Sequence, residues 1–162
     1  MEATQTIQVS QPSDLEVEIT RSFTAPRELV FAAFTEPELI KQWMLGPGDW
    51  SMPVCEVDLR AGGGYRHVWR KPGVPDMGLT GKFLEVTQPE RLVATEEFDQ
   101  DWTGGATTVT TTFDDRAGTT VVTTRVKYAS EEARDAAVRS GMADGMEAGY
   151  RRLDDVLSAP SQ

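Results

Sequence analysis

The stretch GMADGMEAGY, residues 141–150, contains three glycines spaced four residues apart, Gly141, Gly145 and Gly149. Glycine costs about 1 kcal/mol relative to alanine in a helix interior. The surrounding residues nevertheless have a helical pattern that begins at the N-cap candidate Ser130 and continues to about Leu157. At about 100° per residue, Gly149 falls near the centre of an apolar stripe, Gly145 at its edge and Gly141 just outside it. The stripe consists of Val138, Met142, Met146, Gly149, Leu153, Val156 and Leu157.

A row of glycines on a buried helix face has two explanations. The helix can approach a neighbouring sheet closely, or the missing side chains can leave a cavity. Both explanations stay open for Gly149, whereas close contact is expected at Gly141 and Gly145. Charged residues in the same turns, such as Asp144 and Arg151, exclude a membrane dimer motif of the same spacing.

The rest of the chain predicts a sheet that this helix can cover. Residues 15–25 alternate between apolar and polar, with Arg21 as the exception, and two short helices follow Pro26 and Pro37. Six further strands are separated by turn residues. We expect them at residues 52–59, 64–70, 77–87, 92–98, 106–113 and 119–128. Because the connections are short, neighbouring strands should pair antiparallel.

This order of elements predicts an α+β domain, with a curved antiparallel sheet of about seven strands wrapped around a long C-terminal helix. We expect one domain at residues 14–158 and flexible tails at residues 1–13 and 159–162.

Charge and composition exclude several classes of function. The 162 residues carry a formal net charge of −10, which disfavours nucleic acid and anionic membrane surfaces as partners. No apolar run is long enough to cross a bilayer, and the N-terminal residues do not resemble a signal peptide, so we expect a cytoplasmic protein. One histidine and one cysteine are too few for a structural zinc site. We expect no metal and no cofactor.

Several motifs in this order resemble one family. They are FTAPRELVFAAFTEPELIKQW at residues 23–43 followed by GP, DLRAGGGYR at residues 58–66, PERL at residues 89–92, and a terminal helix with GxxxGY and LDDVL. Together they resemble the domain named for the C-terminal half of the activator of the heat-shock-protein-90 ATPase, in the SRPBCC or START-like superfamily. The resemblance covers roughly residues 15–157. The family usually has tryptophan after the helix glycine, where this chain has Tyr150.

This resemblance implies a helix-grip fold with a cavity between the sheet and the C-terminal helix. It does not imply one function, because the superfamily contains lipid and hormone binders, aromatases and cyclases, and co-chaperones. The resemblance does not extend to the separate N-terminal domain of the full co-chaperone, so it does not establish heat-shock-protein activation.

The segment GYRHVWRK, residues 64–71, contains the main candidate site residues. Tyr65, His67 and Trp69 alternate with Arg66 and Arg70, so the three rings should face the concave side of the sheet. They can line a pocket or simply fill the core, with His67 hydrogen-bonded to a neighbour. Further candidates for contact with a ligand are Phe83, Met142, Met146, Gly149 and Tyr150.

For several other residues, the sequence does not show whether the side chain faces the inside or the outside of the sheet. Trp50 and Trp102 could surround a cavity mouth. Glu85 and Glu96 lie within predicted strands whose facing is ambiguous, and an inward acid would have a raised pKa. We expect Cys55 to be a small buried hydrophobic residue.

Three functions agree with these observations. The first is binding of a small apolar or aromatic molecule in the cavity. The second is an aromatase or cyclase type of enzyme, which needs His67 or an inward acid beside the ligand, and for which no catalytic residue can be assigned. The third is a co-chaperone-like interaction domain with a protein partner. The sequence favours the first and leaves the ligand and the oligomeric state open.

Overall fold

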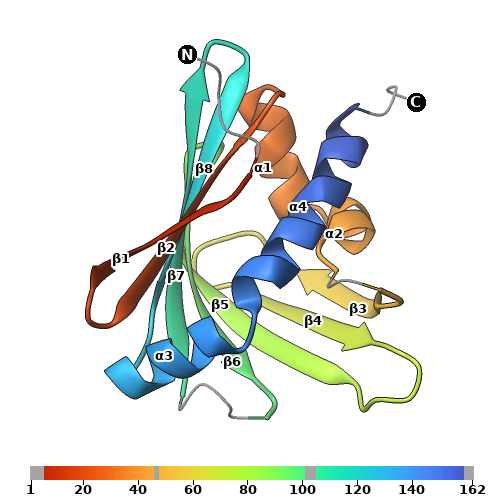
Figure 1. Cartoon of the computed structure of the whole chain (residues 1–162). Helices are drawn as coiled ribbons and strands as arrows, with labels where there is room; N and C mark the ends of the chain where they lie inside the picture. The colour runs from red at the N-terminus through yellow and green to blue at the C-terminus, as the bar shows by residue number, and fades with distance from the viewer. Residues whose placement is uncertain (1–5, 46–47, 101–104, 159–162) are drawn as a thin grey trace.

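An antiparallel sheet and four helices make up the described part of the chain (Figure 1). The structure is a computed structural model that describes residues 6–45, 48–100 and 105–158. Eight strands pair in the order β1-β2-β8-β7-β6-β5-β4-β3. Their bounds are β1 Gln8–Ser13, β2 Glu16–Phe23, β3 Ser51–Val57, β4 Gly64–Arg70, β5 Met77–Thr87, β6 Arg91–Phe98, β7 Thr107–Arg116 and β8 Thr119–Lys127.

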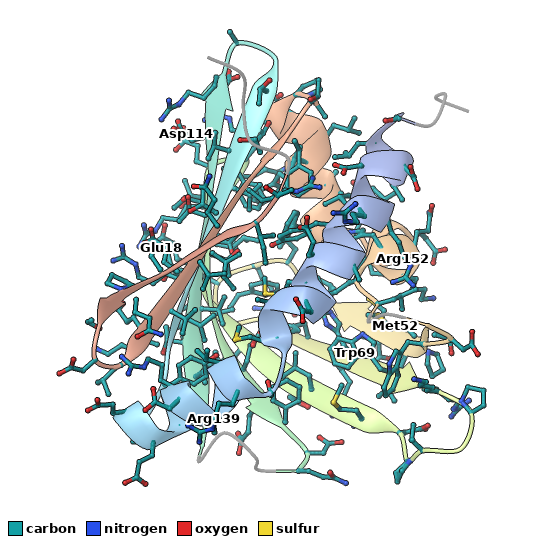
Figure 2. The ribbon with its side chains drawn as sticks, viewed as in Figure 1. Glu18, Met52, Trp69, Asp114, Arg139 and Arg152 are labelled. Carbon is teal, nitrogen blue, oxygen red and sulfur yellow. The ribbon has the colours of Figure 1, made fainter. Side chains whose placement is uncertain are left out.

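The helices are α1 Arg27–Thr35, α2 Pro37–Trp43, α3 Glu131–Arg139 and α4 Met142–Ser158. Figure 1 shows α4 crossing the curved sheet, with α1 and α2 on the same side of the sheet as α4. The sheet therefore has an inner face that packs under helices and an outer face. In Figure 2, Glu18 and Asp114 point away from α4, whereas Trp69 lies on the inner side. This arrangement is the predicted helix-grip fold.

Strand β1 corrects the prediction of a flexible tail over residues 8–13, whereas residues 1–5 and 159–162 of the two predicted tails lie outside the described residues. Val9 pairs with Ile19 of β2, so the strand continues the sheet by one position beyond the expected seven. All six residues of β1 are exposed, and the segment therefore has no buried alternating face that a sequence pattern could reveal. Pro12 is compatible with this position, because an edge strand tolerates a residue without an N–H group.

The terminal helix is interrupted, which corrects the prediction of one helix from Ser130 to Leu157. Ser130 caps α3 as expected, accepting a hydrogen bond from the Ala133 N–H at 3.1 Å. Gly141 has φ +85°, in the left-handed region that favours glycine, and it separates α3 from α4. Because the two helices have different axes, the predicted stripe is not continuous, and Val138 on α3 is exposed.

The nearest neighbour of Gly149 is Trp43 at the end of helix α2, and not the sheet that the close-contact explanation named. A Cβ atom at Gly149 would lie 2.9 Å from the carbonyl oxygen of Trp43, and 3.4 Å from that of Leu45. Arg152 donates a hydrogen bond to the same Leu45 oxygen at 2.9 Å. Among the elements of the described chain, α2 makes more close backbone approaches to α4 than any other element does. The C-terminal end of α2 therefore sets the position of α4 above the sheet.

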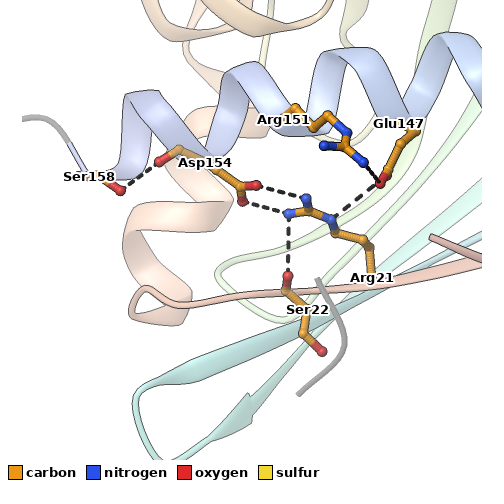
Figure 3. A network of polar contacts seen from close by, with 6 residues as sticks. All are labelled: Arg21, Ser22, Glu147, Arg151, Asp154 and Ser158. Carbon is orange, nitrogen blue, oxygen red and sulfur yellow. Dashed lines mark hydrogen bonds and ion pairs between the residues drawn. The ribbon is translucent and has the colours of Figure 1, made fainter. Parts of the chain in front are cut away.

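A buried arginine explains the exception in the alternation of the first predicted strand. Arg21 of β2 points inward, is 2% exposed, and donates to both carboxylate oxygens of Asp154 on α4, at 2.5 and 2.7 Å (Figure 3). Glu147 lies 4.0 Å from the same guanidinium group. The guanidinium group also lies 4.7 Å from the Phe23 ring centroid. This ion pair connects the C-terminal half of α4 to the sheet.

Candidate functional site

A pocket of about 480 Å³ lies between the inner face of the sheet, α2 and the first turns of α4. Aromatic and aliphatic side chains form most of its walls. The aromatic residues are Phe34, Trp43, Trp50, Tyr65, Trp69, Phe83, Phe98, Tyr128 and Tyr150, and α4 contributes Met142, Gly145, Met146 and Gly149. The pocket exists because α4 packs on α2 and leaves space between its N-terminal half and the sheet.

All eight predicted site residues lie in the walls of this pocket. They are Tyr65, His67, Trp69, Phe83, Met142, Met146, Gly149 and Tyr150. Two of them are also tightly packed: Tyr150 is 3% exposed and meets Phe23 edge to face, with ring centroids 5.2 Å apart, and Gly149 abuts α2. That any of the eight contacts a ligand stays a prediction. Trp50 also lines the pocket, whereas Trp102 lies outside the described residues.

One row of cross-strand neighbours forms the floor of the pocket. Tyr65 of β4 is paired with Gly81 of β5, Gly81 with Glu96 of β6, and Glu96 with Thr107 of β7. A side chain at position 81 would collide with the Tyr65 ring, because a Cβ atom there would lie 2.1 Å from Cζ. The ring therefore lies over Gly81, and its hydroxyl donates to the Thr95 carbonyl oxygen at 2.8 Å.

His67 is the buried imidazole of the pocket wall. It is 6% exposed and lines the pocket beside Tyr65 and Trp69, with ring centroids 5.2 and 5.6 Å away. Among the described residues, neither Nδ1 nor Nε2 has a hydrogen-bond partner. Burial lowers the pKa of His67 to about 4, so the ring is neutral at physiological pH. A neutral imidazole has one N–H donor and one acceptor, and here neither is used.

Glu96 is the inward acid that the sequence left ambiguous. It lines the pocket and is half-buried, and burial raises its pKa to about 7. No cation of the described residues offsets that burial. Burial and the nearby Glu96 charge together raise the pKa of Tyr128 to about 12. Glu85, the other ambiguous acid, instead forms an ion pair with Arg91 at 3.3 Å and does not line the pocket.

Three other polar side chains of the wall have protein partners. The indole N–H of Trp69 donates to the Met44 carbonyl oxygen at 2.8 Å, and that of Trp43 to the Ala33 carbonyl oxygen at 2.8 Å. The Tyr128 hydroxyl contacts the sulfur of Met142 at 3.5 Å. His67 and Glu96 therefore differ from these neighbours in having polar atoms that stay available to a bound molecule.

The remaining chemistry of the site is limited. Cys55 of β3 pairs with His67 across the strands and packs with Ile40 and Met52, but it does not itself line the pocket, and burial raises the pKa of its thiol. The described residues contain no group of three or more histidine, cysteine or acidic side chains placed to hold a metal ion. No helix in the described ranges is long and apolar enough to cross a membrane.

Comparison with known proteins finds one family and many similar folds. The family model for activator of Hsp90 ATPase homolog 1-like protein matches residues 24–158. A crystal structure of a Rhodobacter sphaeroides protein is 39% identical, with a TM-score of 0.90, and the match covers 96% of this chain and 99% of that one. A Nitrosomonas europaea protein is 26% identical, with a TM-score of 0.80, over 91% of this chain and 96% of that one.

A third similar structure is of a protein that is itself described as AHSA1-like. An AHSA1-like protein from Aeromonas hydrophila is 23% identical, with a TM-score of 0.69, over 90% of this chain and 98% of that one. At this identity, the likeness concerns the fold alone. No curated protein sequence matches the chain.

Proposed function

We propose that this chain, which belongs to the activator of Hsp90 ATPase homolog 1-like family of the START-like superfamily, binds a small apolar or aromatic molecule between the sheet and α4. The single observation that carries the proposal is the pocket of about 480 Å³. Small-molecule sites usually have about 300–1,000 Å³ and mostly apolar walls with a few polar groups. The pocket has this size and this composition.

The physical basis of binding is the removal of apolar surface from water. Burial of apolar area contributes roughly 25 cal/mol per Å², and the walls present several aromatic rings to a ligand. Met142 and Met146 have flexible, polarisable side chains that can adapt to the shape of the ligand. The proposal requires no cofactor and no metal.

The enzyme alternative needs His67 or an inward acid beside the ligand. Glu96 lines the pocket as such an acid, but no hydrogen bond in the described residues joins it to His67. The described residues supply no hydrogen-bond partner to either ring nitrogen, so no observation favours a proton transfer by this residue. The co-chaperone alternative needs a contact surface for a protein, and the exposed large hydrophobic residues, such as Val9, Leu29 and Leu84, lie on different elements. We therefore propose binding alone.

The test uses N-phenyl-1-naphthylamine, an uncharged dye whose fluorescence rises in apolar surroundings. Wild-type protein should bind it saturably with a stoichiometry of about one. Gly145→Leu places a side chain in the pocket from a position where a Cβ atom meets nothing within 4 Å. We expect this variant to fold and to lose binding at least tenfold.

Gly145→Ala is the matched control, because it changes the same helix position and adds one methyl group. It should bind the dye within about threefold of wild type. Non-saturable dye binding by the native protein would contradict the proposal, and so would equal binding by the leucine and alanine variants. In that case, the protein-interaction alternative would be preferred.

A further inference from the structure

We propose that the ligand of this pocket is an apolar amine, whose protonated amino group pairs with Glu96 and whose second polar group meets His67, and that the pocket discriminates against carboxylates. The inference rests on the proposed function and names its ligand class. It is carried by the placement of two polar side chains on the inner face of the sheet.

The first argument is the charge of the wall. Among the described residues that line the pocket there is no lysine or arginine, and the acid among them is Glu96. A carboxylate ligand would meet Glu96 with no cation to compensate either group, whereas an ammonium group would supply the missing counter-charge. Burying a charge is costly unless it is paired and hydrogen-bonded. The amine therefore gains an interaction that the site itself leaves unmade.

The second argument is the free hydrogen-bonding capacity of His67. This side chain is more than nine-tenths buried and lines the pocket, and neither ring nitrogen has a hydrogen-bond partner among the described residues. Leaving a buried polar group unpaired is unfavourable, because the group loses its hydrogen bonds to water. A ligand hydroxyl or amide that reaches the ring would remove this cost. An unpartnered buried imidazole in a pocket wall thus indicates a ligand with a polar group of its own.

The third argument is the relative position of the two side chains. His67 is paired with Leu79, and Leu79 with Phe98, so this row is one inward-facing position away from the row of Tyr65, Gly81 and Glu96. His67 and Glu96 are on strands separated by β5, so their backbones are about 10 Å apart across the strands and offset by about 7 Å along them. The spacing suits two polar groups on one small apolar skeleton.

The test compares three probes with the same ring system. They are 2-(1-naphthyl)ethylamine, 2-(1-naphthyl)ethanol and 1-naphthylacetate, each measured by displacement of N-phenyl-1-naphthylamine from wild-type protein at pH 8. We expect the amine to bind at least tenfold more tightly than the carboxylate, with the alcohol between them. Equal displacement by all three would overturn the inference while leaving the proposed function intact, because the dye would still bind.

Variants test whether Glu96 and His67 cause the preference for the amine over the carboxylate. Glu96→Gln should weaken amine binding at least tenfold and alcohol binding less than threefold. Glu97→Gln is the matched control, since this neighbour on β6 is exposed and does not line the pocket. His67→Phe should weaken alcohol binding and keep the preference for amine over carboxylate. An unchanged amine preference in Glu96→Gln would overturn the assignment, and the wild-type order of probes tests the inference even if that variant does not fold.

Discussion

At the scale of residues, the pocket contains two titratable groups whose burial shifts their pKa values in opposite directions. Alternation with Arg66 and Arg70 was enough to predict that His67 faces inward. The same reasoning could not place Glu96, because Glu97 follows it directly and either could have been the outward residue. Its direction is set by the register of β5 and β6, which pairs it with Gly81 under the Tyr65 ring. Register is a property of the folded sheet.

The first prediction concerns the titration of His67. Burial favours the neutral ring and lowers its pKa to about 4, against the reference value of 6.5. An NMR titration of the single histidine should therefore show no change between pH 8 and pH 5.5. A midpoint near 6.5 would mean that the ring is hydrated or has an acidic partner, and would contradict its placement in the pocket wall.

The second prediction is the pH dependence of stability that Glu96 causes. Its pKa of about 7 in the folded state exceeds the reference value of 4.5, so the folded state binds the proton more tightly. The free energy of unfolding should therefore fall as pH rises from 4.5 to 7, by up to about 3 kcal/mol from this group. Glu96→Gln removes the effect, so the variant should match wild type near pH 4.5 and exceed it above pH 7.

Comparing wild type with Glu96→Gln separates the contribution of Glu96 to the pH dependence of stability from the contributions of the other titratable groups at the pocket. His67 contributes in the opposite direction, because its lowered pKa makes stability fall as pH drops from 6.5 to 4. Tyr65 and Tyr128, which interact electrostatically with Glu96, have raised pKa values and stay protonated in this range. Urea denaturation at several pH values would give the difference in the free energy of unfolding between wild type and Glu96→Gln. A difference independent of pH would show that the Glu96 carboxylate is well hydrated.

At the scale of elements, the three glycines of the opening stretch have three different roles. Gly141 ends α3 with positive φ, Gly145 faces open space in the pocket wall, and Gly149 lets the backbone of α2 approach. Equal spacing in the sequence made them look alike. The break at Gly141 sets that residue apart, and the packing around α4 distinguishes Gly145 from Gly149. A glycine inside a helical pattern does not reveal whether the helix continues through it.

The third prediction is that replacing each glycine by alanine changes stability with a different sign or size. Gly145→Ala should stabilise by about 0.5–1 kcal/mol, because alanine restricts the unfolded chain and meets no atom in the folded one. Gly149→Ala should destabilise by about 1–3 kcal/mol, since its Cβ would press on the Trp43 carbonyl oxygen. Gly141→Ala should cost about 1 kcal/mol for the left-handed backbone. Chemical denaturation measures all three, and equal effects would contradict the placement of α4.

The fourth prediction concerns the ion pair that holds α4 to β2. Among the described residues, Asp154→Ala leaves the 2% exposed Arg21 with the more distant Glu147 as its remaining ion-pair partner, and should destabilise by about 3 kcal/mol. Asp155→Ala, at the exposed neighbour on the same helix, should change stability by less than about 0.5 kcal/mol. Similar thermal midpoints for both variants would show that the pair contributes little. The sequence indicated only that Arg21 broke an alternating pattern.

At the scale of the whole molecule, the fold was largely predictable and the space inside it was not. Turn residues and alternation predicted seven of the eight strands of the described chain, because each of the seven has a buried face. Strand β1 was not predicted, because all six of its residues are exposed. The volume of the pocket depends on how far α4 lies from the sheet. That distance is set by contacts between Gly149, Arg152 and the C-terminal end of α2, which are remote in sequence.

The most direct test of the central claim, that a small molecule binds in this pocket, is methyl NMR of protein labelled at its methionines. Met142 and Met146 line the pocket, whereas Met52 is buried outside its wall. On titration with N-phenyl-1-naphthylamine, we predict that the Met142 and Met146 methyl signals shift saturably through the ring current of the dye and that the Met52 signal stays in place. Saturable dye binding without a shift of Met142 or Met146 would contradict the account.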